Sequence, residues 1–325
     1  REPDSTGTMR GGAMYTLSKG LGLPWLGTIF ALLTSLAAFG IGNMVQANSV
    51  ADSLESSFGI APAVTGVVLA VLTAAVILGG IKRIGEVTQV LVPFMSILYL
   101  GGGLIIIALH IADIPGAIAL VFEGAFSGTA ATGGFAGATV GLALRFGIAR
   151  GLFSNEAGLG SAPMVHSAAK TDHPVRQGLY GIFEVFVDTV LVCTITGLAI
   201  LVTGAWTSGL DGATLSGEAF RLGLPGGLGN IIVTASVLLF SFSTVIGWSY
   251  YGETGIVYLF GAKVATPYRI AWLIFIYLGA TGSLQLIWSV ADTLNGLMAI
   301  PNLVSVLFSI PILLKLTKEF FGKQR

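Results

Sequence analysis

Charge is what this sequence has least of. Only 10% of its 325 residues are charged, whereas 54% are hydrophobic. Soluble domains carry about 25% charged residues, and no core of this size has room for so many apolar side chains. The shortage of charge excludes a soluble enzyme and a disordered scaffold. Because 16 basic and 16 acidic residues cancel, a nucleic-acid partner is excluded as well.

Cysteine is also nearly missing. Cys193 stands alone in an apolar run, so it has no partner for a disulfide within the chain and says nothing about redox compartment. The sequence has no initiator methionine, no signal peptide and no apolar run before residue 23. From this opening we expect an N-terminally truncated reading frame. Glycine, in contrast, is abundant at 46 residues, which is typical of closely packed membrane helices.

Long apolar runs fill most of the chain. A bilayer core about 30 Å thick needs roughly 20 apolar residues per helix. On that rule we expect uninterrupted spans at 23–46, 60–81, 87–111, 177–205, 229–257, 269–286 and 289–316. A further apolar region, 138–170, is interrupted at 151–163. The pattern predicts an all-α, polytopic membrane protein with one transmembrane domain over residues 1–325.

The basic residues predict an orientation. With the N-terminus in the cytoplasm, most of them fall on the cytoplasmic side, including Lys82, Lys170, Lys263 and Lys315, and only Arg221 lies in an outer loop. Such a bias is what the positive-inside rule expects. It requires 138–170 to cross the membrane. We therefore predict about eight spans, with both ends of the chain cytoplasmic.

The interrupted region has the sequence GLFSNEAGLGSAP. Its glycines and Pro163 weaken a helix, and Ser154, Asn155 and Glu156 are costly against lipid. Unwound backbone at membrane depth is tolerated only where it lines a cavity or is buried in protein. The stretch predicts a discontinuous helix whose second half begins near Ser161 and points N–H groups at an anion, while unwound carbonyls meet a cation or an ammonium group. A re-entrant loop and the filter of a channel share the same pattern.

Two carboxylates lie inside another predicted span. Glu184 and Asp188 are four residues apart in 177–205, so they share a helix face. They repel one another unless a proton, a cation or a donor lies nearby. Together with Glu156, we consider them gating or structural groups.

Small hydroxyls and aromatic rings share one face of the span 229–257. The face comprises Ser236, Phe240, Ser243, Thr244, Gly247, Trp248 and Tyr251. It suits a cation bound beside the wall of a substrate pocket. Close packing between helices produces the same pattern, so both interpretations stay open.

Two runs of sequence resemble the alanine/glycine:cation symporter family, the sodium:alanine symporters. They are GNMVQANSVADSL at 42–54 and ARGLFSNEAGLGSAPMVHSAAKTDHPVRQGLYGIFEVFVDTVLVCTITGLAIL at 149–201. The resemblance implies a LeuT-type fold, in which two inverted repeats surround a site at the membrane midplane. This chain would supply about eight of about eleven transmembrane helices, since the family's first broken helix is not in the sequence.

The resemblance assigns roles to matching positions. Substrate contacts fall on Gln46, Asn48, Phe153, Ser154, Asn155, Gly158 and Trp248. Trp248 would limit the substrate side chain to a hydrogen or a methyl group. Ser243 and Thr244 stand where LeuT-type folds place a sodium ligand.

The function that the resemblance implies is symport of alanine or glycine into a prokaryotic cell across its plasma (inner) membrane. Sodium would be the coupling ion, alternating access the mechanism, and no cofactor is expected. A proton-coupled amino-acid symporter and an uncoupled channel are the alternatives. An enzyme is not expected, because Ser161, His166 and Glu156 match no known nucleophile arrangement.

Overall fold

Residues 1–126 and 147–322 are described by a computed structural model of the chain. Helices make up nearly all regular structure in these ranges, which confirms the all-α prediction apart from a hairpin of two short strands, β1 (Glu2–Pro3) and β2 (Met9–Arg10). Within the described residues, six helical segments are long and apolar enough to cross a membrane. A polytopic membrane protein is therefore confirmed.

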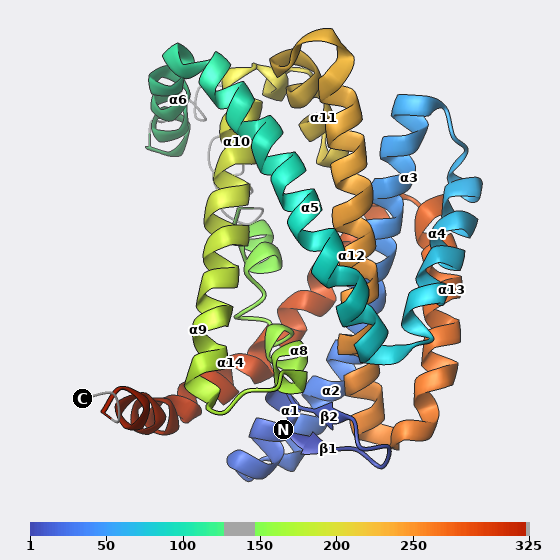
Figure 1. Cartoon of the computed structure of the whole chain (residues 1–325), viewed down its shortest axis with the longest axis vertical. Coiled ribbons are helices and arrows are strands. Elements are labelled where there is room, and N and C mark those ends of the chain that lie inside the picture. The colour runs from blue at the N-terminus through green and yellow to red at the C-terminus, as the bar shows by residue number, and fades with distance from the viewer. Residues whose placement is uncertain (127–146, 323–325) are drawn as a thin grey trace.

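α12 stands near the middle of the bundle (Figure 1). In chain order the helices are α1 (Ala13–Tyr15), α2 (Pro24–Ala38), α3 (Val45–Phe58), α4 (Pro62–Ile77), α5 (Gly80–Leu109), α6 (Ile114–Phe126), a helix at 147–155, α8 (Ala162–Ala168), α9 (Pro174–Val185), α10 (Cys193–Val202), α11 (Gly212–Gly223), α12 (Leu228–Phe260), α13 (Ala265–Thr281) and α14 (Leu284–Gly322). Wider π turns, η2 (Phe39–Met44) and η5 (Phe186–Val192), connect α2 to α3 and α9 to α10.

The first span is longer than the sequence predicted. It runs without a break from Pro24 to Phe58, rather than ending near residue 46. α3 packs against α4, α12 and α13, which buries Asn48 and Ser53, whereas Glu55 and Ser56 near its end are exposed. Residues 127–146, which hold Arg145 and the start of the predicted region 138–170, lie outside the described residues. The total of about eight spans stays a prediction.

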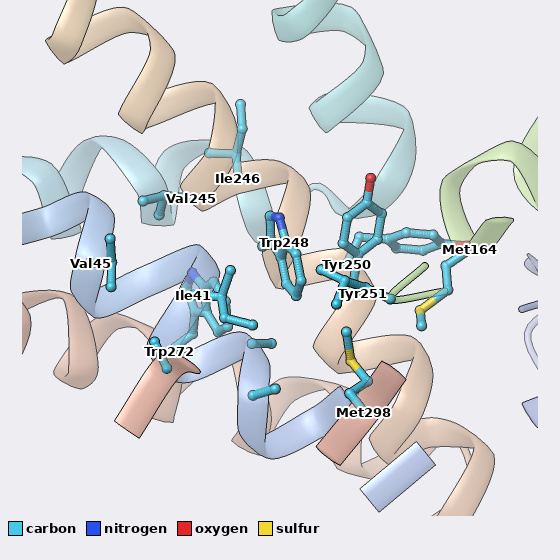
Figure 2. Close-up of a cluster of buried hydrophobic side chains, with 14 of the residues drawn as sticks. Ile41, Val45, Met164, Val245, Ile246, Trp248, Tyr250, Tyr251, Trp272 and Met298 are labelled. Atoms are coloured by element: carbon cyan, nitrogen blue, oxygen red, sulfur yellow. The ribbon is translucent and has the colours of Figure 1, made fainter. Parts of the chain in front are cut away.

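The core is centred on α12, which packs against α2, α3, α5 and α11. Trp248 of α12 is 2% exposed and belongs to a large buried cluster with Trp272 of α13 and Ile41 of η2. Figure 2 shows the Trp248 side chain between Ile41 and Tyr251. The close approach requires Gly42, because a Cβ atom there would lie 2.0 Å from Cβ of Trp248.

Buried charges bind the N-terminal hairpin to the C-terminal part of α12. The Arg10 guanidinium donates to Asp4 (2.7 Å), Glu253 (2.8 Å) and the Thr254 hydroxyl (3.2 Å). Glu253 also accepts from Arg269 of α13 at 2.6 Å. Arg10 and Glu253 are 4% and 3% exposed, so each charge is compensated by its neighbours rather than by water.

Asp4 anchors the turn of that hairpin. Burial alone would raise the pKa of its carboxyl group, but the hydrogen bonds from Arg10, Thr6 and Thr8 outweigh burial and lower the pKa to about 2. Asp4 is therefore ionised at neutral pH. The hairpin presents a fully charged Asp4–Arg10 pair to the end of α12.

Replacing Gly42 with alanine tests the packing of the first span on α12. Gly42→Ala should lower the free energy of unfolding by about 1–3 kcal/mol, because the new methyl group overlaps Trp248. Thermal unfolding in detergent measures the change. Gly247→Ala, on α12 itself, is the matched control: a Cβ atom there meets no other atom within 4 Å, so stability should stay equal or rise slightly. Equal effects of the two variants would contradict the packing described here.

Candidate functional site

The predicted break in the helix is present. Helix 147–155 ends at Asn155, which is half-buried, and α8 begins at Ala162 with Ser161 as its N-cap residue. Between them the chain turns through Glu156, with φ of 55°, and Gly160, with φ of 83°. Among the described residues Glu156 is the one non-glycine residue with positive φ. Such a conformation in a non-glycine residue persists only where its surroundings fix it.

The surroundings of Glu156 come from two elements. Its carboxylate accepts a hydrogen bond from Ser161 Oγ at 2.8 Å and another from Trp248 Nε1 at 2.9 Å. One bond closes the turn, and the other ties the turn to α12. The carboxyl group next to the start of α8 is thus the chain's own, and it accepts these two bonds from side chains.

Asn302 of α14 holds the other side of the turn. Its Nδ2 donates to the carbonyl oxygens of Ala157 at 3.1 Å and Gly158 at 3.0 Å. The Gly158 carbonyl, which we expected near the substrate, is therefore bonded to the protein. Sequence reasoning missed Asn302; its signal is an amide next to Pro301 in an otherwise apolar run.

Upstream of the turn, α14 contacts helix 147–155 as well. Arg150 forms an ion pair with Asp292 and lies 4.0 Å from the centre of the Trp288 ring. The Phe153 ring packs against the same indole, with 5.3 Å between ring centroids. The half-buried Phe153 side chain is thus positioned by Trp288.

The polar residues near the break have separate partners. Ser154 Oγ donates to Asp188 Oδ2 at 2.7 Å, whereas Glu184 Oε2 lies 2.9 Å from His166 Nε2. Glu184 belongs to α9 and Asp188 to η5, whose wider turn begins at Phe186. A π turn changes the angular spacing of side chains, so the carboxylates do not meet a common partner.

Two predicted substrate contacts lie on the first span. Gln46 Nε2 donates to the Ile41 carbonyl at 3.2 Å, an acceptor five residues back in the π turn. Asn48 is 2% exposed, and its Nδ2 donates to the carbonyls of Gly279 and Gly282 at 3.3 and 3.2 Å. Asn48 therefore links α3 to the C-terminal end of α13 by hydrogen bonds. The described bonds of neither residue reach the break.

The predicted sodium ligands lie on α12, about one turn before Trp248. Ser243 Oγ donates to the Phe240 carbonyl at 2.8 Å and lies 3.7 Å from Met95 Sδ of α5. Ser243 and Thr244 are half-buried. Ser243 thus faces α5, whereas the Trp248 indole reaches the break, so an ion at Ser243 and Thr244 stays a prediction.

A cavity of about 1160 Å³ reaches the turn at Ala157. It is lined by the N-terminal segment, α8 and α9, including Lys19, His166, Asp172 and Gln177. Lys19 and Asp172 lie at the end of the molecule that the basic residues predict to be cytoplasmic. Ala157, in the break, is therefore part of the wall of a cavity at that end.

The chain was compared with known families and proteins. The sequence model of the sodium:alanine symporter family matches residues 1–325. The chain belongs to the sodium:alanine symporter family. That membership makes it a transporter of the symporter class rather than an enzyme.

Relatives of this sodium:alanine symporter family member cover nearly the whole chain. The sodium/alanine symporter AgcS of Methanococcus maripaludis is 50% identical over 98% of this chain and 71% of its own length. An uncharacterized transporter of Haemophilus influenzae is 45% identical over 99% and 71%. The probable sodium/glutamine symporter GlnT of Bacillus subtilis is 38% identical over 97% and 66%.

A double-mutant cycle tests the bond between the break and α12. Glu156→Met and Trp248→Phe should each destabilise the protein, and together by less than their sum. The difference should be about 1–2 kcal/mol, because either change removes the same hydrogen bond. Unfolding free energies in detergent measure it. Trp206→Phe, at an indole that is 50% exposed, should add to Glu156→Met without coupling. A coupling near zero for the first pair would show that this bond contributes nothing.

Proposed function

We propose that this protein takes up alanine or glycine together with sodium by alternating access. The observation that supports this proposal most is the break at 156–160, which is hydrogen-bonded to α12 and α14. It occurs in a member of the sodium:alanine symporter family. Secondary transporters place their substrate and ion sites at such discontinuous helices near the membrane midplane. A LeuT-type arrangement of inverted repeats is part of the proposal.

The substrate pocket in this proposal lies beside the break. Phe153 and Trp248 form its apolar walls, and Gln46, Ser154 and Asn155 contribute polar groups. Trp248 is held by Gly42 on one side and Glu156 on the other, so its indole has little freedom to make room. A rigid wall favours a hydrogen or a methyl side chain. The relative named for alanine is also more similar to this chain than the relative named for glutamine.

Sodium is proposed to bind near Ser243 and Thr244. A hydroxyl oxygen is a ligand that sodium accepts, and Ser243 would exchange its bond to the Phe240 carbonyl for the ion. Because both residues precede Trp248 by about one turn, ion binding and pocket shape depend on the same part of α12. Coupling then requires only that ion and substrate stabilise the same conformation.

The proposed location is the plasma (inner) membrane of a prokaryote, with both ends of the chain in the cytoplasm. Figure 1 supports the relative placement of the ends, since the N-terminal hairpin and the last part of α14 lie at the same end of the bundle. The basic residues of the loops favour the cytoplasm for that end.

Uptake into liposomes tests the proposal. The protein is reconstituted, and labelled alanine is followed with an inward sodium gradient, with a proton gradient, and with neither. Accumulation against the alanine gradient should occur only with sodium, and unlabelled glycine should compete. Accumulation driven by protons would replace sodium with protons as the coupling ion. Equilibration without accumulation would indicate a channel and would contradict symport.

The proposed contact on the first span has its own test. Gln46→Ala should raise the KM for alanine roughly tenfold or more with little change in kcat, because a hydrogen bond to a charged substrate group is lost. Sodium-driven uptake over a range of alanine concentrations gives both constants. Gln89→Ala, at an exposed position of α5, should leave both unchanged. An unchanged KM in Gln46→Ala would remove Gln46 from the pocket.

A further inference from the structure

Asn302 meets a need that the break creates. A helix satisfies its own carbonyl oxygens, whereas within the unwound stretch 156–160 the turn's own amides reach the Glu156 carbonyl but not those of Ala157 and Gly158. The Ala157 and Gly158 carbonyl oxygens both accept hydrogen bonds from Nδ2 of Asn302, at 3.1 and 3.0 Å. Asn302 is 3% exposed and comes from α14, so the bonds join segments about 145 residues apart in the chain.

The turn is shaped around the Asn302 side chain. A Cβ atom at Gly160 would lie 2.5 Å from Oδ1 and 2.6 Å from Cγ of Asn302. Gly160 also has a φ of 83°, which side chains other than hydrogen rarely allow. The backbone at 160 therefore lies directly on the amide, while the amide nitrogen bonds the backbone at 157 and 158. Asn302 is enclosed by the turn on two sides.

We propose that Asn302 is a positioning residue, which holds the unwound stretch 156–160 in the conformation that binds substrate. The inference rests on the proposed function, since it takes the substrate pocket to lie beside this stretch. Asn302 acts through the backbone and not by touching substrate: its two N–H bonds are both used on the turn. The same turn carries Glu156, so its position also sets where Trp248 is held.

Loss of the amide should therefore lower the fraction of molecules with a binding-competent turn. The apparent affinity for substrate falls by that fraction, whereas steps after binding are unchanged. Leucine has nearly the shape of asparagine but no donor. Asn302→Leu leaves the Ala157 and Gly158 oxygens unpaired, and removing two hydrogen bonds should change the population about tenfold or more.

Hydrogen exchange tests the conformation without any transport. The amides of Ala157, Leu159 and Gly160 donate within the turn, to Asn155 and Glu156. In Asn302→Leu, peptides over 156–161 should exchange about tenfold or more faster than in the wild type. Asn295→Leu is the matched control, because Asn295 is 5% exposed on the same helix. It should leave the exchange of these peptides unchanged. Asn302→Ala serves as a smaller second variant if leucine prevents folding.

Sodium-driven alanine uptake supplies the second readout. The KM should rise about tenfold or more in Asn302→Leu with kcat nearly unchanged, whereas a merely structural role would lower the amount of active protein and leave KM alone. Unchanged exchange, or faster exchange with an unchanged KM, would overturn the proposal. If the wild type shows no sodium-driven uptake, the proposed function fails, and KM for whichever gradient drives uptake then decides the role of Asn302.

Discussion

Backbone polar groups that a helix no longer pairs are costly when they are buried, and this constraint governs the structure around residue 156. Each buried group released by the break has to be bonded by a side chain, a turn or water. Glu156 and Ser161 satisfy part of the turn, and Asn302 satisfies its carbonyls. The break is thus bonded to α12 and α14 and within itself, although it has no regular structure.

A consequence is that the break fixes the relation between helices far apart in sequence. The indole of Trp248 binds Glu156, and Gly42 lets the first span lie on the same indole. On the opposite side α14 contacts helix 147–155 through Asp292. α12 and α14 therefore both bind the short unwound stretch, and η2 packs on the Trp248 indole that binds it. A movement of that stretch changes its contacts with α12 and α14.

The sequence was most informative where local rules act. Glycines, Pro163 and polar side chains between 151 and 163 predicted a break whose second half begins near Ser161, and the structure has it there. Six of the seven uninterrupted spans predicted from hydropathy are long apolar helices, whereas 60–81 is the shorter helix α4. The first helix continues past the predicted end near 46, because α3 packs against α4, α12 and α13, although Glu55 and Ser56 near its end are exposed.

Partners of single polar residues were beyond sequence reasoning. The partners of Asn302 depend on which segment α14 packs against, and no local sequence pattern reveals that segment. Glu184 and Asp188 were placed on one face by a spacing of four, but the π turn between them shifts that spacing. Asn48 was expected to face substrate, and its described bonds go to α13. The distinction between a packing amide and a binding amide is set by tertiary contacts.

The ion pair between Arg10 and Glu253 also affects the order in which contacts form during synthesis of the chain. The two residues are 243 positions apart, and ribosomes add about 5–20 residues per second. Arg10 therefore waits roughly 10–50 s after its synthesis before its carboxylate partner exists. During that time Asp4 is the ion-pair partner of Arg10 that has already been synthesised. Closure of the N-terminal end is a late event in biogenesis, after α12 has been inserted.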